Sequence, residues 1–319
     1  MQIRQSDLAS FAYCAQQVKL KGLAKSEGWR EPNLSATLRG TVLHFAFETL
    51  QRLHHEGRED ALQVAQATFE YFWDPSHITE LDGINAPVDE WIGYDTWGGL
   101  LQRSLGSLRE AYAWLLKDKS VLLGLEHSFT VPLTIDGEEH TLHGTVDRLN
   151  LRMVSGRPVI GIDDLKGYRQ EKWRLDWEPQ WTIYSYASLQ PGFWTPFYQD
   201  DAIADGFADV VDRLAARGQS ITATPAGNTE VLPRRGRLLW AWDGFKVKDT
   251  GWRTEAHYAR MRAHVREYVK AVRGDMYPLT VNGHVCGYCA FGKGIAQPDG
   301  TYHQVCGDAP LPAIQEGIQ

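Results

Sequence analysis

The feature that most constrains the fold is a change to alternating apolar and polar residues in the middle of the chain. Candidate strands lie at about 125–134, 140–153 and 158–166. A tight-turn sequence separates the last two, which predicts a β-hairpin centred between Ser155 and Gly156. Facing residue numbers then add up to 311, so Asp147 and Asp164 lie opposite one another, with Cβ atoms about 5 Å apart.

Helical periodicity on both sides of these strands predicts an α/β domain. Further predicted elements are a short helix capped by Ser6 and ending near Cys14, helices at about 35–54, 177–189, 206–217 and 253–273, and a strand at about 237–246. The stretch of about 55–122, rich in helix formers and aromatics, is predicted to be a helical insertion. We expect one domain over 1–306 and a mobile tail over 307–319.

The composition is that of a globular protein. The chain has 319 residues, of which 43% are hydrophobic, and a formal net charge of −7. It contains no run of roughly 20 apolar residues and no signal-peptide pattern, so we expect a cytoplasmic protein without a membrane partner. The acidic charge argues against a nucleic-acid footprint over the whole surface, but the arginine-rich stretch 234–237 can still bind phosphate.

The predicted hairpin gathers residues suited to divalent-metal chemistry. Strand alternation directs Asp164 and Lys166 to one face and Asp163 to the other. Two facing carboxylates offer the oxygen ligands that Mg²⁺ prefers, and the lysine ammonium can orient water or stabilise developing phosphoryl charge. His44, on the predicted helix of about 35–54, can complete the coordination through a ring nitrogen.

A plainer interpretation stands beside this one. Asp147 can pair in solvent with Arg148 or Arg169, and Asp164 with Lys166 can be an ordinary surface ion pair. A D-x-K triplet taken alone favours that plainer interpretation, because such triplets arise by chance in most chains. A single helical histidine is likewise more often structural than a ligand.

Four cysteines lie at the two ends of the chain. They are Cys14, Cys286, Cys289 and Cys306. In a reducing compartment this set favours a metal site over disulfides, and the C-x-x-C pair is compatible with zinc, a redox pair or an iron-sulfur cluster. Such a site would join the first helix to the terminal segment and stabilise the domain between them.

Four ordered motifs resemble those of the RecB-like PD-(D/E)XK nucleases. They are RGTVLH, GTVD, IDDLK and QWTIY, although Val146 replaces the proline that names the family. The resemblance implies a restriction-endonuclease-like mixed central sheet flanked by helices. It also implies that His44, Asp147 and Asp164 and the Leu165 carbonyl are metal ligands, that Asp147, Asp164 and Lys166 are catalytic, and that Gln180 and Tyr184 contact DNA or support Lys166. For Glu48, one turn beyond His44, both a ligand role and a supporting role stay open.

The sequences around the cysteines resemble the iron-sulfur branch of the same superfamily, which includes CRISPR-adaptation exonucleases, AddB subunits and related phage enzymes. These sequences are IRQSDLASFAYC and GDMYPLTVNGHVCGYC. The resemblance implies a [4Fe-4S] cluster on the four cysteines, with structural Zn²⁺ as the alternative. It further implies a Mg²⁺- or Mn²⁺-dependent DNA exonuclease acting on single-stranded ends. The alternative is a catalytically silent DNA-binding or docking subunit that works with recombination or CRISPR-adaptation proteins.

Overall fold

The computed structural model describes residues 1–27, 35–80, 97–155, 157–167, 178–194, 233–277, 295–296 and 302–303. The helices are α1 (Gln5–Tyr13), α2 (Ala15–Glu27), α3 (Ser35–His55), α4 (Ala61–Phe72), the short 3₁₀ helix η1 (Ile78–Glu80), α5 (Trp97–Leu115), α6 (Pro179–Ser188) and α9 (Glu255–Gly274). The strands are β1 (Gln2–Arg4), β2 (Val121–Ile135), β3 (Glu138–Val154), β4 (Arg157–Lys166), β5 (Arg234–Trp240), β6 (Lys246–Trp252), β7 (Ile295–Ala296) and β8 (Tyr302–His303).

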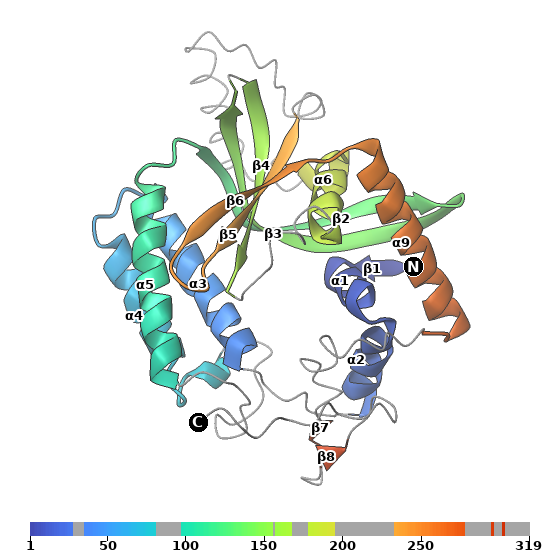
Figure 1. Ribbon diagram of the computed structural model, residues 1–319, viewed down its shortest axis with the longest axis horizontal. Coiled ribbons are helices and arrows are strands. Elements are labelled where there is room, and N and C mark those ends of the chain that lie inside the picture. The colour runs from blue at the N-terminus through green and yellow to red at the C-terminus, as the bar shows by residue number, and fades with distance from the viewer. Residues whose placement is uncertain are drawn as a thin grey trace.

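The main sheet is mixed and has six strands. Its order is β1-β3-β4-β5-β6, with β2 paired to β3 as well. The β1–β3 and β4–β5 pairs are parallel, and the β2–β3, β3–β4 and β5–β6 pairs are antiparallel. Figure 1 shows this sheet between two groups of helices, with β7 and β8 forming a separate small pair. The expected α/β class, with a mixed sheet flanked by helices, is therefore confirmed.

One edge of β3 is shared between two strands, and this creates the space for a site. β2 follows β3 along almost its whole length, so β1 and β4 must both lie on the opposite edge. There β1 pairs with residues 141–143 and β4 pairs with residues 148–154. Among the described strands, none pairs with residues 144–147 on that edge. Asp147 lies in this interval, directly before the β3–β4 ladder begins.

The predicted hairpin register is correct. Arg148 pairs with Asp163 and Val154 pairs with Arg157, as the turn at Ser155 and Gly156 requires. Ser155 has φ 51°, in the left-handed region that such tight turns need. Because the register fixes which face each residue occupies, it also separates Asp163 from Asp164, as expected from alternation.

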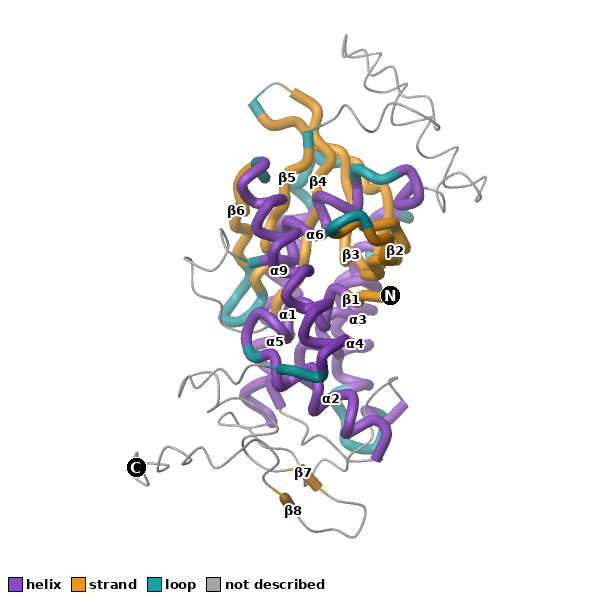
Figure 2. Tube along the Cα trace, turned by 90° about the vertical axis from the view of Figure 1, so that its right-hand side faces the viewer, coloured by secondary structure: helices purple, strands orange, loops and turns teal. Residues whose placement is uncertain are grey.

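Two hydrophobic cores lie on the two faces of the sheet. One core joins the sheet to α1, α6 and α9, with Leu8, Trp181 and Val265 among its buried residues. The other joins it to α3, α4 and α5, with Leu43 and Phe69 among them. Figure 2 shows the same helices from the side, where the two groups overlap. The stretch expected to be a helical insertion supplies α4, η1 and α5.

Two local predictions were wrong. The residue that precedes α1 is Arg4, and the helix starts at Gln5, so Ser6 lies inside the first turn and is not its cap. The strand expected over about 237–246 is two antiparallel strands, β5 and β6, because the chain turns between Ala241 and Phe245. The predicted helix at 206–217 and the tail at 307–319 lie outside the described residues. No helix in the described ranges combines the length and apolar character that crossing a membrane requires.

Candidate functional site

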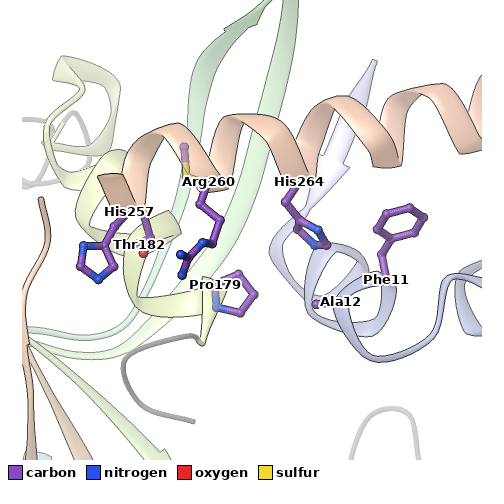
Figure 3. Close-up of a pocket in the computed structure, with 8 residues that line it drawn as sticks. Phe11, Ala12, Pro179, Thr182, His257, Arg260 and His264 are labelled. Carbon is purple, nitrogen blue, oxygen red and sulfur yellow. The ribbon is translucent and has the colours of Figure 1, made fainter. Parts of the chain in front are cut away.

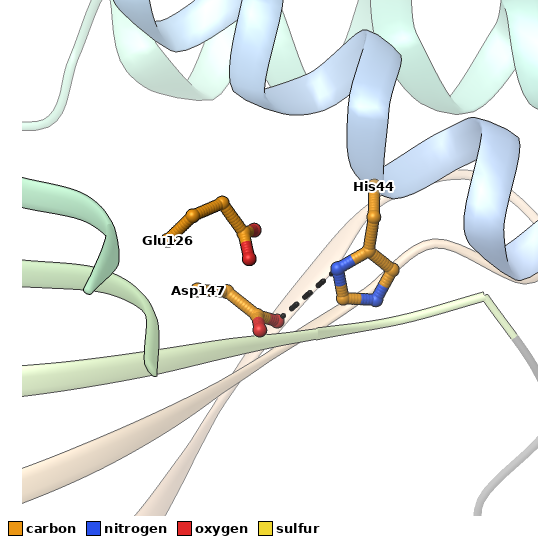
Figure 4. Close-up of side chains that lie close together, drawn as sticks. All are labelled: His44, Glu126 and Asp147. Atoms are coloured by element: carbon orange, nitrogen blue, oxygen red, sulfur yellow. Dashed lines mark ion pairs between the residues drawn. The ribbon is translucent and has the colours of Figure 1, made fainter. Parts of the chain in front are cut away.

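Three possible metal ligands from three different elements meet beside the gap in β3. They are His44 of α3, Glu126 of β2 and Asp147 of β3, and their ligand atoms all lie within 4.8 Å of one another. The Nδ1 atom of His44 is 3.5 Å from Oδ2 of Asp147. Figure 4 shows the imidazole and the Glu126 carboxylate approaching Asp147 from separate elements. Glu126 was not anticipated from the sequence.

The backbone of β2 turns Glu126 towards this group. Leu125 pairs with Arg148 and His127 pairs with Val146, so Glu126 lies opposite Asp147. Its φ of 45° places it in the left-handed region, which is uncommon for a residue other than glycine and is often found at functional sites. The side chain keeps an exposed surface. Loss of water around the carboxyl, and then the charges of Asp147, Glu48 and Asp164, raise the pKa of Glu126 to about 8.

Asp147 is held at the start of the hairpin by the neighbouring strand. The backbone N–H of Leu165 donates to Oδ2 of Asp147 at 2.6 Å. Burial raises the pKa of Asp147 to about 6, although Lys166 and the Leu165 hydrogen bond act in the opposite direction. The backbone of Leu165 also acts to raise the pKa of His44, so both Asp147 and His44 lie close to the end of β4.

A second carboxylate, Asp164, is oriented by three side chains. Lys166 forms an ion pair with its Oδ2 atom, and Gln180 Nε2 donates to its Oδ1 atom at 2.7 Å. Tyr184 lies 3.5 Å from the same oxygen and accepts a hydrogen bond from Gln180 at 2.6 Å. Burial, followed by the Asp164 charge, raises the pKa of Tyr184 well above its usual value, so the hydroxyl stays protonated and can donate.

Asp164, like Asp147, has a raised pKa. Burial raises the pKa of Asp164 to about 6; Lys166 lowers it and Asp147 raises it further. The four side chains Asp164, Lys166, Gln180 and Tyr184 thus form one contiguous group next to the His44 cluster. The structure places the residues expected from the hairpin, the RGTVLH motif and the QWTIY motif near one another.

His44 is neutral at physiological pH. Burial, and then the nearby Lys166 ammonium, lower the pKa of His44 to about 4, while Asp164 and the Leu165 backbone act to raise it. A neutral imidazole has a lone pair available for a metal ion. Glu48 lies one turn along α3, and its charge contributes to the raised pKa of Glu126. The carboxylate of Glu48 therefore faces the same cluster.

A buried arginine in the part of α3 that precedes His44 anchors this helix to the rest of the fold. Arg39 is fully buried and donates to Ser104 Oγ at 2.8 Å, to the Gly167 carbonyl at 2.6 Å and to the Ala241 carbonyl at 2.8 Å. These bonds join α3 to α5 and to the ends of β4 and β5. The close approach of α3 to β4 also depends on Gly167, where an added Cβ would lie 3.2 Å from Cα of Gly40. The RGTVLH motif therefore positions His44 through its arginine and glycine.

The pairing of Asp147 with Arg148, one part of the plainer interpretation, is not what the structure shows. Arg148 points to the other side of the strand, where it donates to Asp163 at 2.8 Å and to Asp118 at 3.0 Å. Arg152 and Arg237 bind the same buried Asp163 carboxylate. Arg169 lies outside the described residues. Asp163 is therefore part of a buried ionic cluster, and Asp164 is the one that faces the site.

The donor set fits a divalent cation. One imidazole nitrogen and two carboxylates already lie within a few ångströms, and Asp164 adds a third carboxylate to the same region. The raised pKa values of these acids arise from burial and mutual repulsion, which the Lys166 ammonium offsets only in part. Hard oxygen donors with one imidazole suit Mn²⁺ and Mg²⁺. His44, Glu126 and Asp147 are the described residues that would hold such an ion.

This electrostatic arrangement predicts that stabilisation by a cation depends on pH. Glu126, Asp147 and Asp164 have raised pKa values, so between about pH 4 and pH 8 the folded protein retains protons that the unfolded chain has lost. Their contribution to stability therefore falls as pH rises. The lowered pKa of His44 has the opposite sign, but only between about 4 and 6.5. Added Mn²⁺ is expected to raise the melting temperature more at pH 8 than at pH 6, because fewer protons compete for the ligands.

Differential scanning fluorimetry with and without Mn²⁺ tests this expectation. Glu126→Gln keeps the side-chain size but removes one ligand charge, so it is expected to reduce both the shift and its pH dependence. Glu267→Gln, on the exposed part of α9, removes the same charge away from the site and serves as the control. A Mn²⁺ shift that is equal at the two pH values and unaffected by Glu126→Gln would contradict the assignment of these ligands.

Only the first of the four cysteines is in the described part of the chain. Cys14 is buried and follows the last residue of α1. Its neighbour Gln16 donates to the Tyr277 carbonyl at 2.7 Å, and Lys19 pairs with Asp275 at 3.0 Å. Tyr277, the residue after which the description of the chain breaks off before Cys286, therefore lies beside α2. Cys286, Cys289 and Cys306 lie outside the described residues.

A separate cavity of about 300 Å³ lies between α1, α6 and α9. Its lining includes Pro179, His257, Arg260 and His264, which Figure 3 shows around the opening. Nε2 of His264 lies 2.9 Å from the Leu8 carbonyl oxygen, so this nitrogen carries the ring proton. The cavity touches α6 at its first turn, but the side chains that line it are not those of the His44 cluster.

The tryptophans near QWTIY do not all face solvent. Trp181 is buried in the core and packs under β5, where a Cβ added to Gly236 would lie 2.7 Å from the indole. It therefore stabilises the fold and is not available to stack on a base. Trp173 and Trp177 lie outside the described residues.

Comparison with known proteins adds little to this geometry. Neither a protein-family model nor a curated protein matches the chain. Among solved structures, one described as "Crystal structure of SSO0001" aligns with 63% of this chain and 72% of that chain, at 11% identity and a TM-score of 0.33. A similarity of that size carries no argument about fold or function.

Proposed function

We propose that the protein is a divalent-metal-dependent DNA exonuclease that hydrolyses phosphodiester bonds, with single-stranded ends as its substrate. The observation that carries the proposal is the cluster of His44, Glu126 and Asp147 next to an Asp164–Lys166 ion pair. Three carboxylates and a neutral imidazole, together with one lysine, are groups suited to metal-assisted phosphodiester hydrolysis.

The residues have separate tasks in this proposal. His44, Glu126, Asp147 and Asp164 would hold Mg²⁺ or Mn²⁺, and Leu165 would add its backbone carbonyl. When bound, such an ion supplies a Lewis acid that polarises the phosphoryl oxygen and makes water more acidic. Lys166 contacts Asp164, so its ammonium group would lie beside the bound ion. There it can orient water and stabilise negative charge on the phosphoryl group. Gln180 and Tyr184 hold Asp164 in place through its Oδ1 atom.

The remaining parts of the proposal follow the resemblance to the RecB-like PD-(D/E)XK nucleases. The mixed sheet would be of the restriction-endonuclease-like kind, and Cys14 with Cys286, Cys289 and Cys306 would hold a [4Fe-4S] cluster. Support comes from the buried position of Cys14 and from the hydrogen bond between Gln16 and the Tyr277 carbonyl, which places Tyr277, nine residues before Cys286, beside α2. Iron and zinc analysis of anaerobically purified protein separates a cluster from structural Zn²⁺.

The assay for the proposed function is digestion of end-labelled DNA. We expect nucleotide release from single-stranded ends with Mn²⁺ or Mg²⁺ and none with EDTA, because the site residues alone cannot activate water for attack on a phosphodiester. A covalently closed single-stranded circle distinguishes an exonuclease from an endonuclease. Metal-independent binding without any digestion would instead support the catalytically silent DNA-binding subunit.

A further inference from the structure

Two lysines and a tryptophan extend the site across the neighbouring strands. Lys166 at the end of β4 pairs with Trp240 at the end of β5, and Trp240 pairs with Lys246 at the start of β6. Lys248 pairs with Leu238, which itself pairs with Asp164. Directly paired residues point to the same face of a sheet. Trp240, Lys246 and Lys248 therefore lie on the same face and at the same end of the sheet as Asp164 and Lys166.

The indole ring gathers the two ammonium groups. Nζ of Lys248 lies 4.5 Å from the Trp240 ring centroid, and Nζ of Lys246 lies 5.2 Å from it. A ring attracts a cation through its quadrupole and leaves the net charge in place, whereas a carboxylate would neutralise it. In the described ranges no carboxylate forms an ion pair with either ammonium. Lys246 is exposed and Lys248 is partly exposed, so both charges face solvent.

The two lysines would offset the repulsion between the acidic site and a nucleic-acid substrate. Glu48, Asp147 and Asp164 would repel a polyanion, and the whole chain has a net charge of −7. Strands in a sheet are about 4.8 Å apart, so β6 lies about 10 Å from β4. The lysines are thus placed to attract phosphates next to the one beside Lys166.

We propose that Lys246 and Lys248, held over Trp240, bind the backbone phosphates of single-stranded DNA next to the bond that is cut. This inference rests on the proposed function for the choice of ligand. It adds a substrate-binding surface on β5 and β6, and its chemistry is charge recognition of the backbone, which carries no base sequence preference.

The test is metal-free binding of a fluorescein-labelled oligothymidylate of about 20 nucleotides, followed by anisotropy in EDTA over about 0.05–0.3 M salt. Each phosphate contact to a single strand contributes about 0.7 to the slope of log affinity against log salt. Lys246→Gln with Lys248→Gln is expected to lower that slope by about 1.4 and to weaken binding about tenfold at the low-salt end. Thermal melting checks that the double variant is folded.

A matched control is available on the same chain. Lys117 and Lys119 are also exposed, two residues apart, and lie near the opposite end of the sheet, before the β2 residue that pairs with Leu151. Replacing both by Gln removes the same charge and is expected to leave the slope unchanged. Equal losses in the two double variants, or a wild-type slope after loss of Lys246 and Lys248, would overturn the proposal.

The binding and cleavage assays test the two proposals independently. A protein that binds DNA through these lysines but releases no nucleotides with Mn²⁺ contradicts the nuclease proposal alone. A protein that cleaves, with the same KM and the same salt slope after the lysine substitutions, contradicts the binding surface alone. Absence of metal-free DNA binding by the wild-type chain also overturns the binding surface.

Discussion

Asp164→Asn is expected to lower Mn²⁺-dependent nucleotide release by about a thousandfold or more while the protein remains folded. The substitution keeps the size of the side chain but removes the negative charge that Lys166 and the cation both need. Loss of this charge is not expected to destabilise the protein, because burial and Asp147 raise the pKa of Asp164 more than Lys166 lowers it and so disfavour the ionised form. At pH 8 without metal, the free energy of unfolding is therefore expected to stay the same or rise.

Single-turnover digestion and urea unfolding, measured on the same preparation, test the two halves of this prediction. Lys166→Ala is expected to reduce the rate of release in the same way, since its ammonium contacts the Asp164 carboxylate. Exposed Asp249→Asn, on β6, controls for the loss of one negative charge. Activity near the wild-type level in both Asp164→Asn and Lys166→Ala would refute the proposed active site.

The hairpin explains why much of this site was predictable from sequence. The turn at Ser155 and Gly156 set the register of β3 and β4, and alternation then separated Asp164 from Asp163. The same reasoning, applied to a turn at Asp136 and Gly137, would have predicted that Glu126 faces Asp147. Both have positive φ, at 52° and 83°, and an Asp-Gly turn pairs Ile135 with Glu138. Continuing that register places Glu126 opposite Asp147.

Other parts of the site had no such local signal. Arg39 is anchored by groups far away in the chain, on α5 and at the ends of β4 and β5, so its role depends on how the helices pack against the sheet. The break between β5 and β6 was missed because apolar residues flank the turn on both sides, although Asp243-Gly244, with φ 78° at Gly244, marks it. Periodicity reports which residues share a face, but tertiary packing decides which faces meet.

Sequence periodicity also did not predict the ionic cluster around Asp163. Asp163 is 0% exposed and accepts hydrogen bonds from Arg148, Arg152 and Arg237, while Asn150 Nδ2 donates to it at 2.7 Å. Burial alone would raise the pKa of Asp163, but the three arginines, Arg237 foremost, hold it below its usual value. The cluster joins β3, β4 and β5 behind the site.

Asp163→Asn is expected to cost about 3–5 kcal/mol of unfolding free energy, in contrast to the same change at the adjacent Asp164. It leaves three guanidinium groups around a neutral amide, with Asp118 as the remaining described carboxylate of the cluster. Typical stabilities are about 5–15 kcal/mol, so much of the protein would unfold under mild conditions. Urea unfolding followed by circular dichroism measures the loss.

The pH dependence of stability provides a second test of the same cluster. The pKa of Asp163 is depressed, so its contribution is fully present above the unfolded value near 3.8 and is lost as pH falls through the folded value. Asp118 behaves alike: burial opposes ionisation, but Arg148 and Arg237 lower its pKa to about 2. Wild-type protein is therefore expected to lose stability steeply below about pH 4, and Asp163→Asn to lose less over that range. If Asp163→Asn were as stable as Asp164→Asn, and equally sensitive to acid, the cluster would not be what holds the three strands behind the site.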